Sequence, residues 1–396
     1  MGAFGLADDW LQRRSSTLKS MQIEDEILNP IISDLIKGQR LSITQGLALL
    51  KHPNLNGVLE IANLDKKSRY GENIFFNVNI HVNQSNICVL ACKFCAFRRG
   101  KRADDAYALD INSYISQIEP FAEIVDEVHS VGGLHPEWDL GYYCNLFEQT
   151  KNRFPDITIK ALTAVEIKHI ATISGESFEE TIRQLKDSGL GSIPGGGAEI
   201  LVDSVRDIIC KGKESSQEYL DIHGIAHTLG MPTNCTMLFG TVETPEERII
   251  HLDKLRCQQD KTGGFQCFVP YPFLPDSSRL PEAQLSSANE ILRMIAVSRL
   301  MLDNIPHIKA YRMNIGDELA ELAISVGADD IDGTVIQESI MHLAGSTAQL
   351  DFGIDELCRL VRRAGGEPIR RDTVYSKFKA IEIKSPSSVH RLNMAK

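Results

Sequence analysis

Short apolar segments alternate with longer helical segments along most of this 396-residue chain. Eight of the apolar segments have the length and composition of strands: Ile74–Asn79, Glu127–Val131, Ile157–Leu162, Leu190–Ile193, Thr233–Phe239, Gly264–Val269, Ile308–Asn314 and Asp329–Ile331. Helix-period segments lie between them, including Ile115–Val125, Tyr142–Phe154, Phe178–Ser188, Pro245–Gln259 and Leu285–Leu302. This alternation predicts an α/β fold with a parallel sheet, closed by eight repeats into a (βα)8 TIM-type barrel. A six-strand partial barrel is the alternative if the last two strands are misread.

Helical patterns are also expected on both sides of the barrel. Ser42 and Gln45 form a capping-box pattern within an N-terminal region that reads as helical. Ile354–Arg363 is expected to form one more helix, stopped by Gly365 and Pro368, and the tail from Ser385 is polar. The predicted organisation is an N-terminal helical extension over 1–69, a barrel over 70–350, and a C-terminal helix and polar tail over 351–396.

Three cysteines follow the first predicted strand within eight residues, at Cys88, Cys92 and Cys95. Fully ligated iron–sulfur clusters take four thiolates, so three leave one iron open for chemistry. We therefore predict one 4Fe–4S cluster at this loop. An open iron can chelate the amino and carboxylate groups of S-adenosylmethionine (SAM) and transfer an electron to its sulfonium.

Three other uses of these thiols are possible: a zinc site, disulfide bonds and buried free thiols. A zinc site could recruit His81, but zinc ligands usually come as separated pairs. A disulfide framework is typical of short secreted chains, which this chain is not. Free cysteine is common in cores, and that interpretation suits the remaining six: Cys144, Cys210, Cys235, Cys257, Cys267 and Cys358.

Overall composition disfavours several classes of protein. The net charge of −11 repels a polyanion on average, so nucleic-acid binding is not expected. The chain contains no run of eighteen apolar residues, which a membrane-spanning helix would need. Asp8, Asp9 and Trp10 stand where a signal peptide would need an apolar segment. Nine cysteines without an export signal predict a cytoplasmic location.

Unusual polar residues follow the predicted strands, where barrels place their active sites. The cysteine loop follows the first strand, and the next five strands are followed in order by Gly132–Pro136, Thr163 and Glu166, Gly195–Glu199, Glu243 and Tyr271. Arg312 and Asn314 end the seventh strand, and Asp330 and Asp332 lie on the eighth. Their common position after strands supports the barrel.

Several of these residues are candidate SAM contacts. The backbone of Gly132 and Gly133 could accept from the methionine ammonium, although a tight turn explains these glycines equally well. Glu199 could accept both hydrogens of the ribose diol, or be an ordinary acid at a helix N-terminus. Phe94 could stack on adenine or pack under the loop. The other predicted cofactor-binding residues are Thr163, Glu166 and Glu243.

Four residues are candidate substrate contacts. His81 and His135 could act in acid–base chemistry or bind a carboxylate, or they could be satisfied core histidines. Alternation along the seventh strand puts Arg312 and Asn314 on one side. If that side faces the barrel mouth, Arg312 could bind an anionic substrate in a bidentate manner, and if it faces outward it is a surface residue.

The cysteine spacing is the signature of the radical SAM superfamily. Across about Leu35–Phe378 the chain resembles one group of it, the menaquinone enzymes of the futalosine pathway and the deazaflavin-forming FO synthase subunits. The shared motifs are His81–Cys88, the cysteine loop through Phe97, Gly132–Pro136, Lys160–Glu166, Ser192–Ile200 and Arg371–Tyr375. Pro194–Ala198 and Asp330–Thr334 look most like aminofutalosine synthases. Leu134 departs from the Gly-Gly-Glu common in the superfamily, which leaves the glycine carbonyls as the likelier contact to the methionine amine.

The resemblance implies a transferase that consumes SAM as a co-substrate. A 5′-deoxyadenosyl radical would add to 3-[(1-carboxyvinyl)oxy]benzoate, and rearrangement and decarboxylation would give 6-amino-6-deoxyfutalosine for menaquinone biosynthesis. Such chemistry needs a dry cavity and close positioning of the vinyl carbon. The expected partners are the enolpyruvyl-benzoate substrate and a flavodoxin- or ferredoxin-type reductant, while a homodimer is left open. The alternatives are a dehypoxanthine futalosine cyclase, an FO synthase subunit or, more remotely, a non-catalytic metal or electron-transfer protein.

Overall fold

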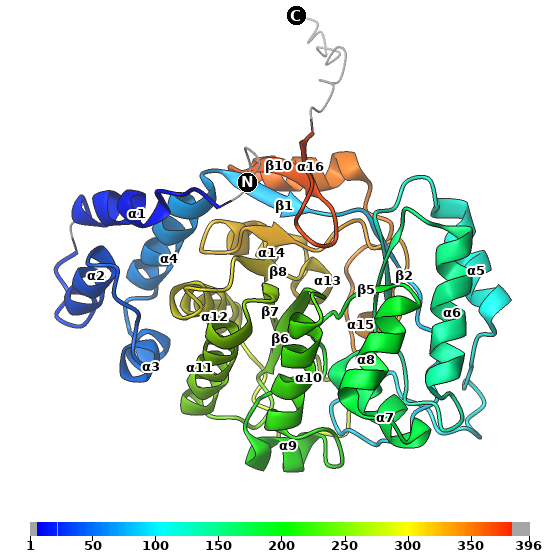
Figure 1. Cartoon of the computed structure of the whole chain (residues 1–396). Helices are drawn as coiled ribbons and strands as arrows, with labels where there is room; N and C mark the ends of the chain where they lie inside the picture. The colour runs from blue at the N-terminus through cyan, green and yellow to red at the C-terminus, as the bar shows by residue number, and fades with distance from the viewer. Residues whose placement is uncertain (1–5, 22, 382–396) are drawn as a thin grey trace, which may run out of the picture.

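The computed structural model describes residues 6–21 and 23–381 of the chain. A parallel barrel lies at its centre (Figure 1). Its strands are β1 (Asn73–Phe76) with β2 (Asn79–His81), β3 (Glu127–Ser130), β4 (Thr158–Ala161), β5 (Leu190–Ser192), β6 (Thr233–Phe239), β7 (Phe265–Pro272), β8 (His307–Ala310) and β9 (Asp330–Ile331). All eight predicted strands are confirmed, the first of them as the pair β1 and β2.

Two sheets meet to close the barrel. One runs β2-β3-β4-β5, and the other contains β1-β9-β8-β7-β6. A parallel bridge between Ile193 and Thr233 joins β5 to β6. At the other junction β1 pairs with β9, while β2, directly after it in the chain, pairs with β3. The closed arrangement confirms the eight-strand prediction over the six-strand alternative.

Helices surround the strands, as the alternation predicted. Their bounds are α5 (Ile111–Ile118), the 3-10 turn η1 (Glu119–Phe121), α6 (Leu140–Arg153), α7 (Ala164–Ser174), α8 (Phe178–Asp187), α9 (Asp203–Ile209), α10 (Ser216–Thr228), α11 (Pro245–Thr262), α12 (Ala288–Met301), α13 (Arg312–Ile315), α14 (Asp317–Ile324) and α15 (Ile340–Leu343). Within the described residues, no helix is both long and apolar enough to cross a membrane.

The seventh predicted strand was extended too far. β8 ends at Ala310, and Arg312–Ile315 forms the short helix α13. The carboxylate of Asp332 accepts hydrogen bonds from the backbone N–H groups of Arg312 and Met313. This acceptor satisfies the free donors that begin a helix, as a local N-cap would. Because it comes from beyond β9, twenty residues later, the local alternation could not reveal the helix start.

The described residues up to Tyr70 are largely helical, as predicted. They form α1 (Trp10–Lys19), α2 (Leu28–Ile36), α3 (Ile43–Lys51) and α4 (Leu55–Tyr70), and the capping box of Ser42 and Gln45 begins α3. These helices lie to one side of the barrel, with α4 packed along α12 and α3 against α11 (Figure 1). Inside this extension Asp65 is buried and pairs with both Arg14 and Arg69.

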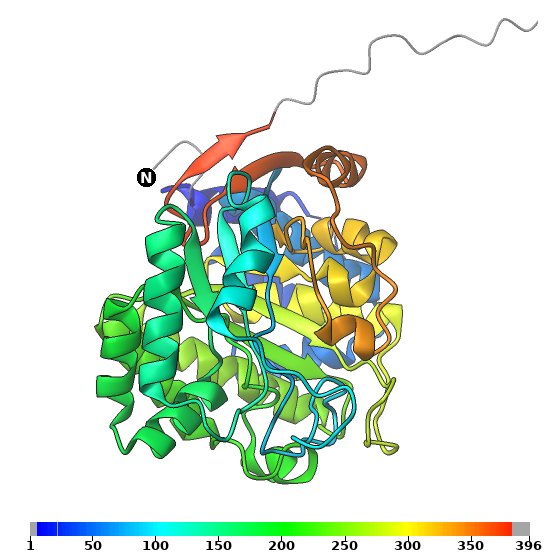
Figure 2. The same ribbon diagram turned by 90° about the vertical axis from the view of Figure 1, so that its right-hand side faces the viewer.

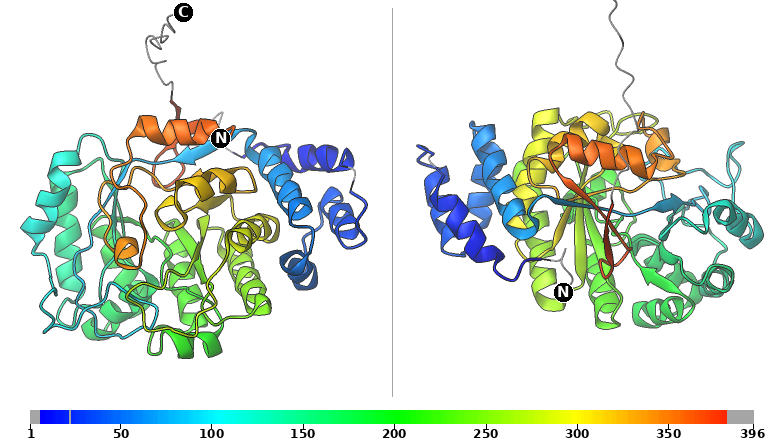
Figure 3. Two further views of the ribbon diagram at one scale, coloured as in Figure 1. Left: turned by 180° about the vertical axis from the view of Figure 1, so that it is seen from behind. Right: turned by 90° about the horizontal axis from the view of Figure 1, so that it is seen from above.

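The C-terminal region contains two strands that the sequence did not predict. α16 (Ile354–Arg363) has the predicted bounds, but Pro368 lies within β10 (Glu367–Arg371) rather than in a terminating turn. β10 pairs in parallel with β1, and β11 (Phe378–Ala380) pairs antiparallel with β10. These strands and α16 lie across the end of the barrel opposite the cysteine loop (Figures 2 and 3). The predicted polar tail from Ser385 lies outside the described residues.

Candidate active site

The cysteine loop lies at the carboxyl end of β2, where the barrel prediction placed it. Cys88, Cys92 and Cys95 are all free and half-buried. Neighbouring segments fix the backbone of the loop: the N–H of Lys93 donates to Ile209 O at 2.8 Å, and Nη2 of Arg279 donates to Ala91 O at 2.9 Å. The loop is therefore held in place by residues from α9 and from the segment after β7.

The three thiols fit an iron–sulfur cluster better than a single ion. Among the described residues, no group of three His, Cys, Asp or Glu side chains is arranged to hold one metal ion. A cubane spreads its thiolate ligands over separate iron atoms, so its ligands need not converge on one point. Burial raises the pKa of Cys92 to about 12 and also raises that of Cys95. A bound metal is what deprotonates such thiols.

Gly132 and Gly133 lie directly against the chain that leads into the cysteine loop. A Cβ on Gly133 would lie 2.2 Å from the carbonyl oxygen of Ile87, and one on Gly132 would lie 2.8 Å from that of Ser85. The N–H of Gly133 donates to Ser85 O at 2.7 Å. These glycines therefore allow two backbone segments to pack closely, and no turn is assigned at either of them. The carbonyl oxygens of both glycines accept no hydrogen bond from the described residues, so their predicted contact with the methionine ammonium stays open.

Thr163 and Glu166 form a capping box that begins α7. Oε1 of Glu166 also accepts from the N–H of Gly132 at 3.0 Å and from Nε2 of Gln84 at 3.0 Å. Burial raises the pKa of Glu166 to about 7, although these hydrogen bonds oppose the shift. Glu166 thus ties the glycine turn to α7. Only Thr163 of the pair lines the central cavity.

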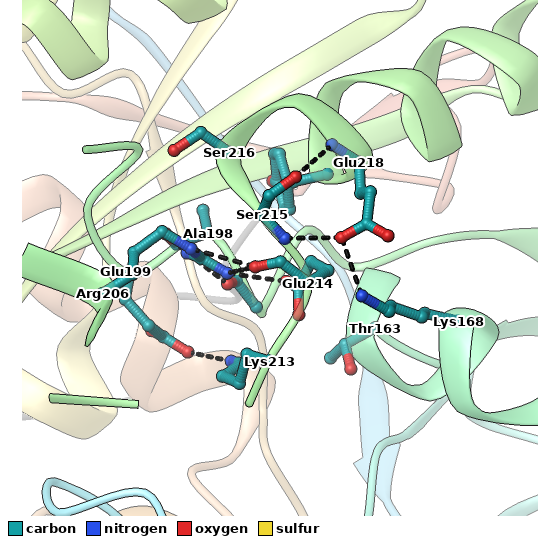
Figure 4. A network of polar contacts seen from close by, with 12 residues as sticks. Thr163, Lys168, Ala198, Glu199, Arg206, Lys213, Glu214, Ser215, Ser216 and Glu218 are labelled. Carbon is teal, nitrogen blue, oxygen red and sulfur yellow. Dashed lines mark hydrogen bonds and ion pairs between the residues drawn. The ribbon is translucent and has the colours of Figure 1, made fainter. Parts of the chain in front are cut away.

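Glu199 lies in a buried polar network at the mouth of the barrel (Figure 4). Its Oε1 accepts from Nζ of Lys213 at 2.5 Å, and its Oε2 lies 3.5 Å from the hydroxyl of Tyr271. Nζ of Lys213 also lies 5.7 Å from the centroid of the Phe94 ring. Since α9 begins only at Asp203, Glu199 is not an acid at a helix N-terminus. The fold therefore brings two of the predicted SAM contacts, Glu199 and Phe94, close to one lysine.

Sequence reasoning missed Lys213 and Arg206. Arg206 is buried and donates to the carbonyl oxygens of Gly197 and Glu214, each at 3.1 Å, which fixes the glycine segment over α9 (Figure 4). Neither residue belongs to a motif. Both lie in charged segments that read locally as solvent-exposed, and their burial depends on partners from the glycine segment.

A cavity occupies the barrel interior below the cysteine loop. Its empty volume is about 940 Å³. His81, Thr163, Gly196, Tyr271 and Asp332 are the rim and site residues from the sequence that line it, and the cations Lys160, Lys309 and Arg371 line it as well. His81 stacks on His129 with ring centroids 4.4 Å apart. Burial and the charge of His129 hold the pKa of His81 well below its ordinary value, so it lies in the cavity as a neutral ring.

The other predicted site residues do not line this cavity. Arg312 lies in α13, not on a strand, and is fully buried. It pairs with Asp317 at 3.1 Å, donates to Gln349 O at 3.1 Å and packs over the Phe352 ring at 4.4 Å. Asn314, also in α13, donates to Pro272 O at 3.1 Å. The strand alternation expected for Arg312 and Asn314 was therefore wrong, and Arg312 neither lines the cavity nor lies on the surface. Both residues have structural partners.

Glu243 and His135 also have partners close by in the chain. Glu243 accepts from the backbone N–H groups of Gly240 and Thr241 and from Nε of Arg248, at 2.6, 2.9 and 2.8 Å. His135 stacks on Trp138 at 4.3 Å, and burial lowers its pKa. The hydrogen bonds of Glu243 fix its own loop. The predicted cofactor contact of Glu243 and the predicted substrate contact of His135 stay predictions.

Comparison with known proteins supports the interpretation of this site. Residues 82–255 match the model of the radical SAM superfamily, and residues 262–384 match that of the CofH/MqnC C-terminal region. The chain is 39% identical to an aminodeoxyfutalosine synthase of Thermus thermophilus, over 90% of this chain and 97% of the relative. It is 35% identical to a cyclic dehypoxanthine futalosine synthase of Streptomyces coelicolor, over 88% of each. The crystal structure of methylornithine synthase shares the fold, with a TM-score of 0.69, 17% identity, and coverage of 85% of this chain and 96% of that one.

Proposed function

The chain belongs to the radical SAM superfamily and is an enzyme of it, and on this premise we propose that it is an aminodeoxyfutalosine synthase. It would convert SAM, 3-[(1-carboxyvinyl)oxy]benzoate and water to 6-amino-6-deoxyfutalosine, methionine and bicarbonate. The observation that carries this proposal is the 39% identity to the Thermus thermophilus synthase over 97% of that protein. The 35% identity to a cyclic dehypoxanthine futalosine synthase makes the sister cyclase the second candidate.

Cys88, Cys92 and Cys95 would hold the 4Fe–4S cluster. When bound, this cluster supplies the electron that cleaves SAM. The charge of Lys213 acts on the site by lowering the pKa of Cys92, which burial raises. A fixed positive charge near the thiolates would stabilise them in their ligating form.

Glu199 is the candidate ribose contact. Its Oε1 is occupied by Lys213, and its Oε2 lies 3.5 Å from the Tyr271 hydroxyl, at the long limit of a hydrogen bond. Oε2 is thus the oxygen left to accept from a ribose hydroxyl. Phe94, beside Lys213, presents a ring for the adenine. These two contacts would hold the nucleoside between the cysteine loop and the cavity.

The cavity below would orient the second substrate and exclude water. Tyr271 and Tyr311 lie on its wall, and Arg371 from β10 lies at the end opposite the cysteine loop. Holding the vinyl carbon close to the nucleoside is a positioning task, and excluding water from the cavity would protect the radical. A flavodoxin- or ferredoxin-type reductant and a cytoplasmic location are predictions that go with this proposal.

Product analysis tests the proposal. The enzyme is reconstituted anaerobically with iron and sulfide and incubated with SAM, dithionite and the enolpyruvyl benzoate. Mass spectrometry should find adenosine covalently joined to the benzoate, with methionine formed in equal amount. Free 5′-deoxyadenosine without a joined product would contradict the synthase and favour the cyclase.

Two cysteine variants provide matched controls. Cys92→Ser removes a predicted cluster ligand and should abolish product and lower the iron content. Cys144→Ser changes a thiol that is also free and half-buried but lies on α6, and should retain both. Equal loss in both variants would mean that the cysteine loop has no special role.

A further inference from the structure

Lys160 is a buried cation with an unused set of donors. It lies on β4, where its register partner is His129 of β3, whose own partner is His81 of β2. Its side chain lines the cavity although the residue is only 4% exposed. The nearest carboxylate oxygen, Oε2 of Glu127, is 3.9 Å from Nζ, which is beyond hydrogen-bond distance. Among the described residues, Nζ of Lys160 has no hydrogen-bond partner.

The other two cations of the cavity, Lys309 and Arg371, share one hydrogen-bonded carboxylate, that of Asp330. Arg371 donates to Asp330 through Nε at 2.6 Å and through Nη2 at 3.1 Å. Lys309 forms an ion pair with the same carboxylate. Asp330 therefore gives both of these cations a hydrogen-bonded carboxylate, whereas Lys160 has three N–H donors and no carboxylate within hydrogen-bond distance.

Lys160 also carries an electrostatic cost that a ligand could offset. Burial lowers its pKa, and the charge of Glu127 only partly opposes that effect. A buried ammonium without a hydrogen-bonded anion is unfavourable unless a partner arrives. A carboxylate placed in the cavity would supply both the charge and the acceptors.

We propose that Lys160 binds the benzoate carboxylate of the substrate deep in the barrel. This inference rests on the proposed function, because the substrate is the one proposed there. Lys160 lies within β4, three residues before Thr163 at the mouth. The enolpyruvyl end must stay at the mouth, close to the nucleoside of SAM, so the ring carboxylate is the end that reaches inward. Two or three charge-assisted hydrogen bonds from Nζ would then fix the ring and set specificity for a benzoate.

A cycle of one variant and one substrate analogue tests the inference. The analogue is 2-phenoxyacrylate, which keeps the enolpyruvyl group and lacks the ring carboxylate. Equilibrium dialysis of the reconstituted enzyme with SAM but no reductant measures binding without turnover. The wild type should bind the full substrate roughly 10- to 100-fold more tightly than the analogue, the range expected for hydrogen bonds to a charged group. Lys160→Met should bind both equally.

Two further variants keep the test sound. Lys160→Met leaves Glu127 buried without its neighbouring cation, so Lys160→Met/Glu127→Gln removes both charges and protects the fold. Lys168→Met changes a half-exposed lysine of α7 that pairs with Glu218 outside the cavity, and should keep the wild-type preference. If the double variant also retains that preference, the inference is overturned while the proposed function stands. Failure of the wild type to make the adenosyl adduct would instead overturn the proposed function.

Discussion

Gly133 shows how one residue can govern the cysteine loop from outside it. Any side chain there would meet the backbone carbonyl of Ile87, next to Cys88, at 2.2 Å. Backbone cannot yield as a flexible side chain can, so Gly133→Ala should displace the start of the loop. We expect the variant to bind clearly less iron after anaerobic reconstitution, measured as iron and sulfide per chain.

Gly100 supplies the control for that substitution. It lies in the connection between β2 and α5 that contains the cysteine loop, and a Cβ there would meet only the end of the Arg98 side chain at 3.8 Å. Gly100→Ala should therefore bind iron as the wild type does. Normal iron content in Gly133→Ala would show that the loop can shift to accommodate a methyl group.

At the same scale, the sequence located the cysteine loop but not its charged surroundings. The three thiols identify themselves by spacing within one segment. Lys160 and Lys213 cannot be identified by spacing. A lysine is expected to be exposed, and only the folded structure shows the elements that bury it. Arg312 shows the opposite error: its expected position depended on a strand register that ended two residues earlier. Local pattern thus predicts residues that act within one segment and misses those defined by distant partners.

Among the elements, β10 had the weakest sequence signal for a strand, yet its two arginines make contacts that matter for the structure. Its adjacent arginines point to different environments: Arg371 is buried and pairs with Asp330, and Arg370 is half-exposed and pairs with Asp126 at 2.7 Å. The helix before β10 ends as the Gly365–Pro368 segment predicts, and Pro368 is acceptable in the short strand that follows near a sheet edge.

The two arginines give a matched prediction. Arg371→Met breaks a buried pair and should destabilise the protein by about 3 kcal/mol, near the lower end for such pairs because Lys309 and Tyr375 still contact Asp330. Arg370→Met removes a partly exposed pair and should cost less than about 1 kcal/mol. Urea unfolding measures both, and equal losses would show that β10 is not anchored by Arg371.

Over the whole molecule, the fold was predictable because its signal is repeated. Eight strand segments and the helices between them each contribute a little periodicity, so an error such as the overlong seventh strand does not change the architecture. The closure of the barrel and the pairing of β1 with both β9 and β10 are long-range events, for which no local pattern exists.

Acid stability is a property of the whole molecule that follows from its buried histidines. Burial lowers the pKa of His227 to about 4 and that of His251 to about 3, and holds that of His223 well below its ordinary value of 6.5. Between these pKa values and 6.5 the unfolded chain takes up protons that the folded chain does not. Stability is therefore present above pH 6.5 and is lost as the pH falls below it.

The free energy of unfolding should fall by about 1.4 kcal/mol per pH unit for each such histidine. Urea unfolding at pH 7.5 and 5.5 should show this loss, and His227→Gln should reduce the slope by roughly one histidine's share. An unchanged slope in that variant would mean that His227 is protonated in the folded protein.

The pairing of β1 with β10 has a consequence for biogenesis. Asn73 meets Glu367, so the pairing spans most of the described chain. Contacts of such separation form late, since a very large loop must close before they are gained. During synthesis the open side of β1 would thus stay unpaired while almost all of the enzyme emerges, offering a template for neighbouring chains. Slow translation, low temperature or a holding chaperone should therefore raise the soluble yield.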